Sequence, residues 1–127
     1  MKITSINAPN APMASGGYSQ AVEITGPSKL LFISGQIPLD VNARLPATFR
    51  DQCLLAWANV ESQLRAAGMG IGNLVKVTTF LSSRDYASEN RSVREEVLGD
   101  HAPALTVIIT GIFDEAWLVE IEAIAAA

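Results

Sequence analysis

The chain has 127 residues, of which 49% are hydrophobic and 17% are charged, and its formal net charge is −4. This length predicts one domain, residues 1–127, and the apolar composition indicates that some of its surface is buried between subunits. The acidic balance argues against nucleic-acid partners, and no apolar run has the length of a signal peptide core or a membrane span, so we expect a cytoplasmic protein without a membrane partner.

The first clear pattern is the segment AVEITGPSKLLFISG, residues 21–35. Apolar and polar side chains alternate before the turn signal at residues 26–28, and an apolar run follows it. This pattern predicts a hairpin of two short strands.

The clearest helix is expected over residues 49–67. Apolar side chains recur there at steps of three and four, which places on one face Phe49, Cys53, Trp57, Val60, Leu64 and Ala67. Thr48 is the expected N-cap, and Gly68 is the expected stop.

The rest of the chain predicts a strand over residues 73–82, a helix capped by Asp85 and running to Val97, and strands over 105–112 and 116–125. This order indicates an α+β fold in which a mixed sheet carries both helices on one face. The strands have apolar residues on both sides, so we expect copies of the chain to cover the other face.

The last predicted strand offers a candidate for acid and base chemistry. Side chains alternate along a strand, so Glu120 and Glu122 share one face, about 7 Å apart. Paired carboxylates are a common way to divide acid and base roles between two groups. The alternative is an edge strand with a solvated polar face.

Two further segments could line a ligand pocket. GGYSQAV, residues 16–22, places two glycines before Tyr18, and SGQIPLD, residues 34–40, ends a strand with Ser34 and Gly35. Simple surface turns explain both segments nearly as well.

Other chemistries find little support. His101 is the only histidine, which excludes a histidine pair for a metal, and Cys53 lies on the apolar helix stripe, where a small core residue is expected. Nucleotide and zinc-protease motifs are absent, so those two functions find no support, and we expect no metal. Arg91 and Arg94 lie on the second helix, facing either solvent or a neighbouring subunit.

Taken in order, these segments resemble the RidA/YjgF/UK114 family of reactive-intermediate deaminases. The resemblance rests on GGYSQAV, SGQIPLD, AAGMGIGNLVKVTTFLSSRDY, Asn90, APALT and VEIEAIA, and it covers nearly the whole chain. It implies a chorismate-mutase-like fold with a six-stranded mixed sheet, assembled as a homotrimer around a central barrel of sheets, with ligand clefts at the subunit interfaces.

The resemblance also implies an activity, the hydrolysis of enamines and imines to a carbonyl compound and ammonia without a cofactor. Glu120 would hold the attacking water, together with the main chain of Val107. The implied substrate-binding residues are Tyr18, Ser34, Gly35, Asn90, Leu105 and Val107.

Leu105 departs from the family pattern, because family deaminases have an arginine there that grips the substrate carboxylate. An isobutyl group cannot replace a bidentate guanidinium. Three hypotheses follow: an enzyme for substrates without a carboxylate next to the reacting carbon, an imino-acid deaminase in which Arg91 or Arg94 of a neighbouring subunit replaces the lost cation, or a non-catalytic trimer that binds a small ligand or a protein.

Overall fold

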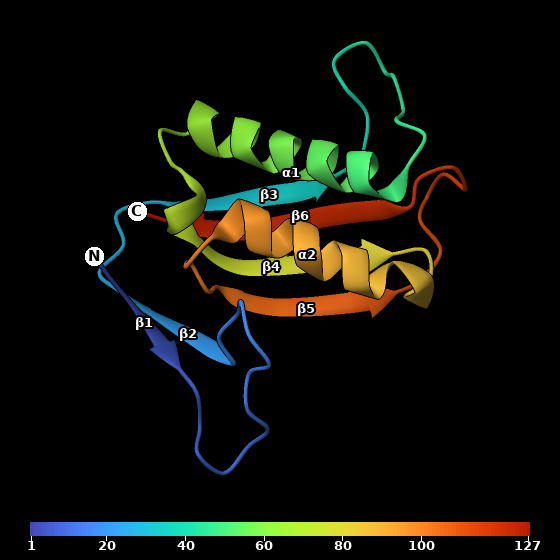
Figure 1. Cartoon of the computed structure of the whole chain (residues 1–127). Coiled ribbons are helices and arrows are strands. Elements are labelled where there is room, and N and C mark those ends of the chain that lie inside the picture. Colours follow the sequence, from blue (N-terminus) through green and yellow to red (C-terminus); the bar gives the residue numbers. More distant parts are fainter.

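Two helices lie on one face of a four-stranded sheet in the computed structural model, which describes residues 1–127 (Figure 1). They are α1, Phe49–Ala66, and α2, Ala87–Leu98, and they contact each other. The prediction that both helices cover a single face is confirmed. Neither helix is long and apolar enough to cross a membrane.

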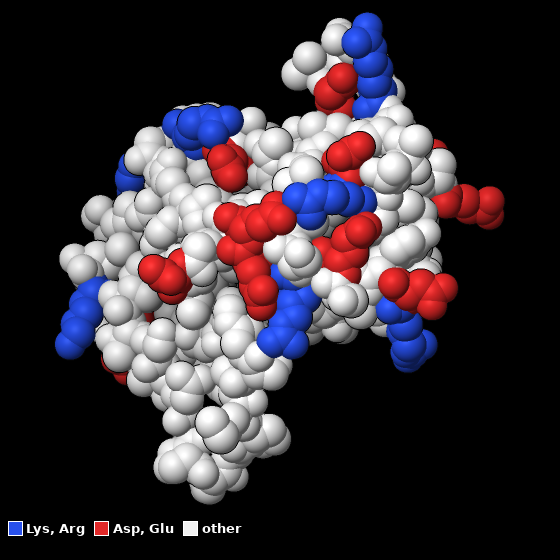
Figure 2. Space-filling model, in the orientation of Figure 1, with Lys and Arg blue, Asp and Glu red and all other residues white.

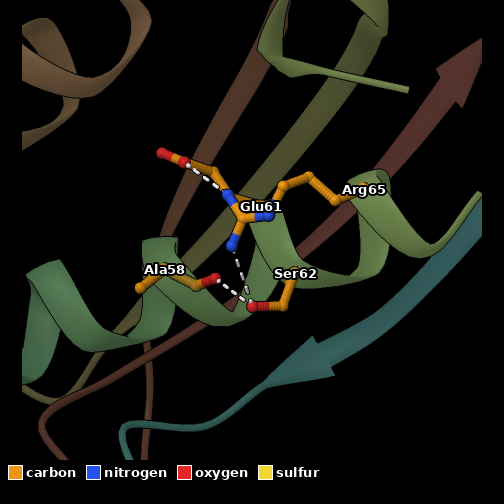
Figure 3. A network of polar contacts seen from close by, with 4 residues as sticks. All are labelled: Ala58, Glu61, Ser62 and Arg65. Carbon is orange, nitrogen blue, oxygen red and sulfur yellow. Dashed lines mark hydrogen bonds and ion pairs between the residues drawn. The ribbon is translucent and has the colours of Figure 1, made fainter. Parts of the chain in front are cut away.

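The start and stop of α1 follow the local sequence. The hydroxyl of Thr48 accepts a hydrogen bond from the Asp51 amide at 3.2 Å, and Gly68 adopts a left-handed φ of 72° that ends the helical path. The solvent side of the helix carries a small polar network, in which Arg65 pairs with Glu61 at 3.4 Å and Ser62 donates to the carbonyl of Ala58 (Figure 3).

The second helix begins differently from the prediction. The hydroxyl of Ser83 accepts a hydrogen bond from the Asp85 amide at 3.1 Å and caps a 3-10 turn, while α2 itself has no side-chain cap. Asp85 therefore lies inside a short 3-10 turn, Arg84–Tyr86, and α2 starts only after it. The predicted cap was wrong, whereas the end of the helix at Leu98 lies one residue from its expected place.

The main sheet is mixed, as predicted. Its order is β3-β6-β4-β5, with bounds Leu30–Gln36, Val119–Ala126, Leu74–Leu81 and Ala104–Ile109. The last strand of the chain, β6, runs antiparallel to both of its neighbours, while β4 and β5 are parallel. β5 is an edge strand, so half of its main-chain groups face away from the sheet.

The remaining two strands form a separate sheet. β1, Lys2–Ile6, and β2, Ala21–Thr25, pair antiparallel with each other. They approach the main sheet near β5 (Figure 1), where Ser19 forms a bridge with Ala104. The six strands of this subunit are thus divided into four and two, which corrects the expectation of one six-stranded sheet.

The hairpin predicted over residues 21–35 was also wrong. Both of its segments are strands, but they do not pair with each other: β2 pairs with the preceding strand β1, and β3 pairs with β6 near the end of the chain. The amides of Ser28 and Lys29 donate to the carbonyl of Ala127 at 2.8 and 2.9 Å, which directs the chain toward β6. The residues at 26–28 predicted the turn correctly, but they did not identify the strand with which each segment pairs.

The two faces of the main sheet differ in exposure. Residues that point toward the helices, such as Val77, Leu81 and Ile121, are fully buried, and they form the core together with α1 and α2. On the opposite face, Phe32 is 71% exposed and Ile108 is 41% exposed. The prediction that both faces carry apolar residues is confirmed.

Charged side chains of both signs mix on the helix-covered side of the molecule (Figure 2). The loop between β1 and β2, residues 7–20, contains no charged residue. No extended basic patch is visible in this view, in keeping with the acidic composition.

Candidate functional site

The predicted site residues lie in two groups. The first, called the Glu120 group, comprises Ser34 and Gly35 near the end of β3 and Glu120 at the start of β6. The second, called the Leu105 group, lies around β5 and α2 and comprises Tyr18, Asn90, Leu105 and Val107. The structure places Gly35 against Glu120, whereas Ser34 lines a hollow beside Glu122, and it places Glu120 and Leu105 on opposite faces of the sheet.

In the Glu120 group, a glycine makes room for the carboxylate. A Cβ atom added at Gly35 would lie 2.8 Å from Cδ of Glu120 and would collide with its carboxylate oxygen. Any larger residue at this position would displace the acid. Glu120 is half-buried and forms no ion pair or side-chain hydrogen bond within the subunit. Its carboxylate therefore lies against the main chain at Gly35 and remains free to contact a ligand or water.

Glu120 also borders a hollow at the end of the sheet. This hollow is lined by Phe80, Thr110, Gly111, Ile112, Phe113 and Glu120. Aromatic and aliphatic side chains with one unpaired carboxylate are a common composition for a small-molecule site. Phe113 is 95% exposed, so the rim of the hollow is open within a single subunit.

Two side chains of α1 position the segments that carry the Glu120 group. Nδ2 of Asn59 donates to the carbonyls of Ile37 and Leu39, each at 2.9 Å, and so fixes the chain that follows Gly35. Gln52 is buried and accepts a hydrogen bond from the amide of Leu118 at 2.8 Å, just before β6. The sequence analysis missed both residues, although polar side chains close to an apolar helix stripe are a usable signal.

Glu122 shares a face with Glu120, as predicted. In the register of the sheet, Glu120 is opposite Phe80 and Glu122 is opposite Thr78. Glu122 is exposed, however, and lies beside a different hollow of about 390 Å³ on the open face of the sheet. The lining of that hollow includes Phe32, Ser34, Lys76, Thr78 and Ile124.

The Leu105 group faces the other way. Leu105 is paired with Val77 in the sheet and packs against the core beneath the helices. Asn90 is 2% exposed, and its Oδ1 lies 3.8 Å from the thiol sulfur of Cys53 on α1. These side chains thus lie on the face opposite to the one from which Glu120 projects.

The sheet itself separates the two groups within a subunit. Phe80 of β4 lies between Glu120 of β6 and Ile108 of β5 in one row of the register. Adjacent strands are about 4.8 Å apart, so the two outer strands are roughly 10 Å apart. A single copy of the chain does not bring Glu120 next to Leu105, so a site that used both groups would need a second copy.

Tyr18 lies on a loop that is tied to the start of β5. The next residue, Ser19, is buried. Its amide donates a hydrogen bond to the carbonyl of Pro103 at 3.0 Å, and its hydroxyl donates to the carbonyl of Ala102 at 2.6 Å. The Tyr18 oxygen accepts a hydrogen bond from the Ser15 amide at 3.3 Å. Hydrogen bonding with Ser15 holds the pKa of Tyr18 below its usual value, with smaller contributions from Arg91 and Arg94.

The residues that were judged unlikely to carry chemistry behave as predicted. Burial raises the pKa of the Cys53 thiol to about 12, so it is not a nucleophile at neutral pH. His101 lies in a loop, where its ring nitrogen is 2.7 Å from the carbonyl oxygen of Leu74. The structure contains no cluster of three or more histidine, cysteine or carboxylate side chains that could hold a metal ion.

Comparison with known proteins identifies the family of the chain. The sequence model described as endoribonuclease L-PSP matches residues 8–127. The chain belongs to the RidA/YjgF/UK114 family. Among its relatives, this RidA-family chain is 33% identical over 118 residues to a RutC family protein of Pyrococcus horikoshii, with 91% of each chain covered.

A second relative is TdcF of Escherichia coli strain K12, which its name designates provisionally as a reactive intermediate deaminase. It is 32% identical over 125 residues, with 94% of each chain covered. The crystal structure of E. coli TdcF with bound serine superposes with a TM-score of 0.74 at 30% identity, over 98% of each chain. The RidA/YjgF fold, with two helices on mixed sheets, therefore extends over nearly the whole chain.

Proposed function

We propose that residues 1–127 form one RidA/YjgF-like domain that assembles as a homotrimer and hydrolyses an enamine or imine in clefts between subunits. The separation of the Glu120 group from the Leu105 group supports the clefts, because only a neighbouring copy could bring the two together. The apolar open face of the sheet supports the assembly, since Phe32 and Ile108 would be buried in a central barrel.

The unpaired carboxylate of Glu120 carries the proposal. Hydrolysis of an imine needs a water that attacks the C=N carbon, and a carboxylate can hold that water and accept its proton as the C–O bond forms. A proton delivered to nitrogen then lets ammonia leave as the carbonyl compound forms. Because β5 is an edge strand, the main chain at Val107 is available as a second water contact. The reaction needs no cofactor.

The side chain at position 105 determines the substrate class. Leu105 packs into the subunit core and offers no charge to a carboxylate. We therefore assign to this chain an enamine or imine without a carboxylate next to the reacting carbon. The designation of TdcF as a reactive intermediate deaminase supports the reaction type. The endoribonuclease description of the family is a poor guide here, because the chain is acidic and has one histidine.

The test is ammonia release from two freshly generated substrates, 2-aminoacrylate and an imine made from a neutral primary amine by an amine oxidase. We expect hydrolysis of the neutral imine above the rate without protein. Glu120→Gln should lower the rate constant by roughly 100- to 10,000-fold, the usual contribution of general acid–base catalysis. Glu122→Gln is the matched control on the same strand and face, and it should leave the rate unchanged.

Two further variants sharpen this test. Gly35→Ala should lower the rate by displacing the Glu120 carboxylate. Leu105→Arg should gain hydrolysis of 2-aminoacrylate. If native protein and Glu120→Gln release ammonia equally from every substrate, the catalytic proposal is wrong. A protein that binds small ligands or another protein without turning over any imine would instead be a non-catalytic trimeric binding module.

A further inference from the structure

Arg94 is a buried cation without a partner. It is 5% exposed, takes part in no ion pair or hydrogen bond, and its Nε–H is enclosed with no acceptor. An arginine keeps its charge, so enclosing its Nε–H without an acceptor is costly. Burial, followed by the charge of Arg91, lowers the pKa of Arg94 from its usual value. A buried arginine without a counter-charge indicates a site that suits an anion.

The surroundings of Arg94 add a second cation but no free acid. Arg91, one turn earlier on α2, pairs with Glu95 at 3.3 Å and donates from Nη2 to the carbonyl of Ser15. The nearby carboxylate of Glu95 is therefore already engaged by Arg91. Arg94 is left as the member of this pair of arginines that has no counter-charge within the subunit.

The loop above Arg94 passes close to its guanidinium. Gly16 and Gly17 adopt left-handed φ values of 110° and 73°, and a Cβ added at Gly17 would lie 4.0 Å from Nη2 of Arg94. The same Cβ would lie 3.6 Å from Cγ of Glu95, so the glycine lets the main chain pass close to Arg94 and Glu95. Tyr18 follows directly, and its oxygen accepts a hydrogen bond from the amide of Ser15, the residue whose carbonyl accepts from Arg91.

This loop is also joined to the strand that carries Leu105. Ser19 holds the carbonyls of Ala102 and Pro103, which precede Leu105 by three and two residues. The unpartnered cation and the position that lacks the family arginine thus belong to one region of the same subunit. This differs from the hypothesis that a neighbouring subunit supplies the missing charge.

We infer that Arg94, assisted by Arg91 and the hydroxyl of Tyr18, binds the carboxylate of a small ligand. In its substrate assignment, the inference rests on the proposed function: the substrate carries its carboxylate away from the reacting carbon, so that it reaches Arg94 instead of position 105. A planar guanidinium with free N–H groups suits a carboxylate better than an ammonium would.

The experiment follows the arginine Nε–H signals of the full-length protein by NMR during titration with 4-oxopentanoate. Pentan-2-one is the matched neutral probe, with the same carbon chain and ketone but no carboxylate. We expect the Arg94 signal to shift with 4-oxopentanoate and to stay in place with pentan-2-one. No variant is needed for this measurement, so a folding defect cannot obscure it.

Variants then assign the contact. Arg94→Gln should weaken 4-oxopentanoate binding about 10- to 100-fold. This corresponds to about 1.4 to 2.8 kcal/mol of binding free energy, because each tenfold change in Kd equals about 1.4 kcal/mol. Arg50→Gln removes the same charge from an arginine that is exposed and paired with Glu96, and it should leave binding unchanged. Equal binding by Arg94→Gln and native protein would overturn the inference. An Arg94 signal unmoved by any carboxylate, as when a carboxylate of another copy already occupies it, would also overturn it.

The inference and the proposed function fail separately. A protein that hydrolyses the neutral imine but never binds 4-oxopentanoate retains the function and loses the Arg94 site. A protein that binds 4-oxopentanoate through Arg94 but hydrolyses no imine retains the site and loses the function.

Discussion

The two faces of the four-stranded sheet are made by the same strands, yet one face is buried in the folded chain and the other stays exposed. Val77 and Ile121 on the helix-covered face are fully buried, whereas Phe32 and Ile108 on the open face keep 71% and 41% of their surface exposed. The covered face supplies the core of the subunit. The open face holds apolar side chains that gain little from folding, and an exposed apolar surface of this kind is typical of a binding surface.

The covered face should show the largest effect on stability. Ile121→Ala removes three buried carbon atoms from the strand that lies between β3 and β4. We expect the free energy of unfolding to fall by about 2 to 5 kcal/mol, because the close-packed surroundings cannot fully refill the cavity. Urea denaturation followed by circular dichroism measures this. A loss that depended on protein concentration would place Ile121 at an interface instead of in the core.

The open face should respond through assembly. Phe32→Ala removes an aromatic ring whose burial against another copy is worth about 1.5 to 3 kcal/mol. We expect analytical ultracentrifugation to show smaller species at micromolar concentration while the far-UV spectrum stays native. Val41→Ala is the control, since that apolar side chain is 100% exposed on a loop outside the sheet. Identical sedimentation of Phe32→Ala and native protein would show that Phe32 lies outside the assembly interface.

Sequence patterns predicted the covered face better than they predicted strand pairing. The apolar stripe of α1 and the caps at Thr48 and Gly68 are local features, and the structure confirmed them. The predicted hairpin over residues 21–35 failed because partner choice depends on strands more than 80 residues away. A turn signal shows where the chain changes direction and does not identify the strand that it joins.

In the candidate site, too, local patterns gave correct predictions and long-range contacts were missed. The alternation of the last strand placed Glu120 correctly on the face shared with Glu122. No pattern could show that Gly35 makes room for that carboxylate, because the two residues are far apart in sequence. The burial of Arg94 was equally hidden, since a charged residue on a helix predicts a solvated surface. The residues that hold the site together through long-range contacts are the ones that sequence reasoning missed.

On the covered face, removal of a buried hydroxyl should raise the free energy of unfolding, in contrast to the loss expected for Ile121→Ala. Thr79 is fully buried in β4, and its Oγ1 has no hydrogen-bond partner. Thr79→Val keeps the shape and removes the unsatisfied group, so we expect a gain of about 1 kcal/mol in the free energy of unfolding. Thr78→Val is the matched control on the open face, where the hydroxyl reaches solvent and little change is expected. If Thr79→Val is destabilising, a water molecule or another group must satisfy that hydroxyl.

The smallest effect is expected on the outer side of the helices, away from both faces of the sheet. Arg50 of α1 contacts both carboxylate oxygens of Glu96 on α2 at 2.8 and 2.9 Å, and hydrogen bonding with Glu96 raises the pKa of Arg50. Both side chains are largely exposed, so water and salt screen the pair. A double-mutant cycle of Arg50→Gln and Glu96→Gln should give a coupling within experimental error at 0.5 M salt. A coupling that persisted there would mean that this side of the helices is covered too, and the contrast between a covered and an open surface would then extend beyond the sheet.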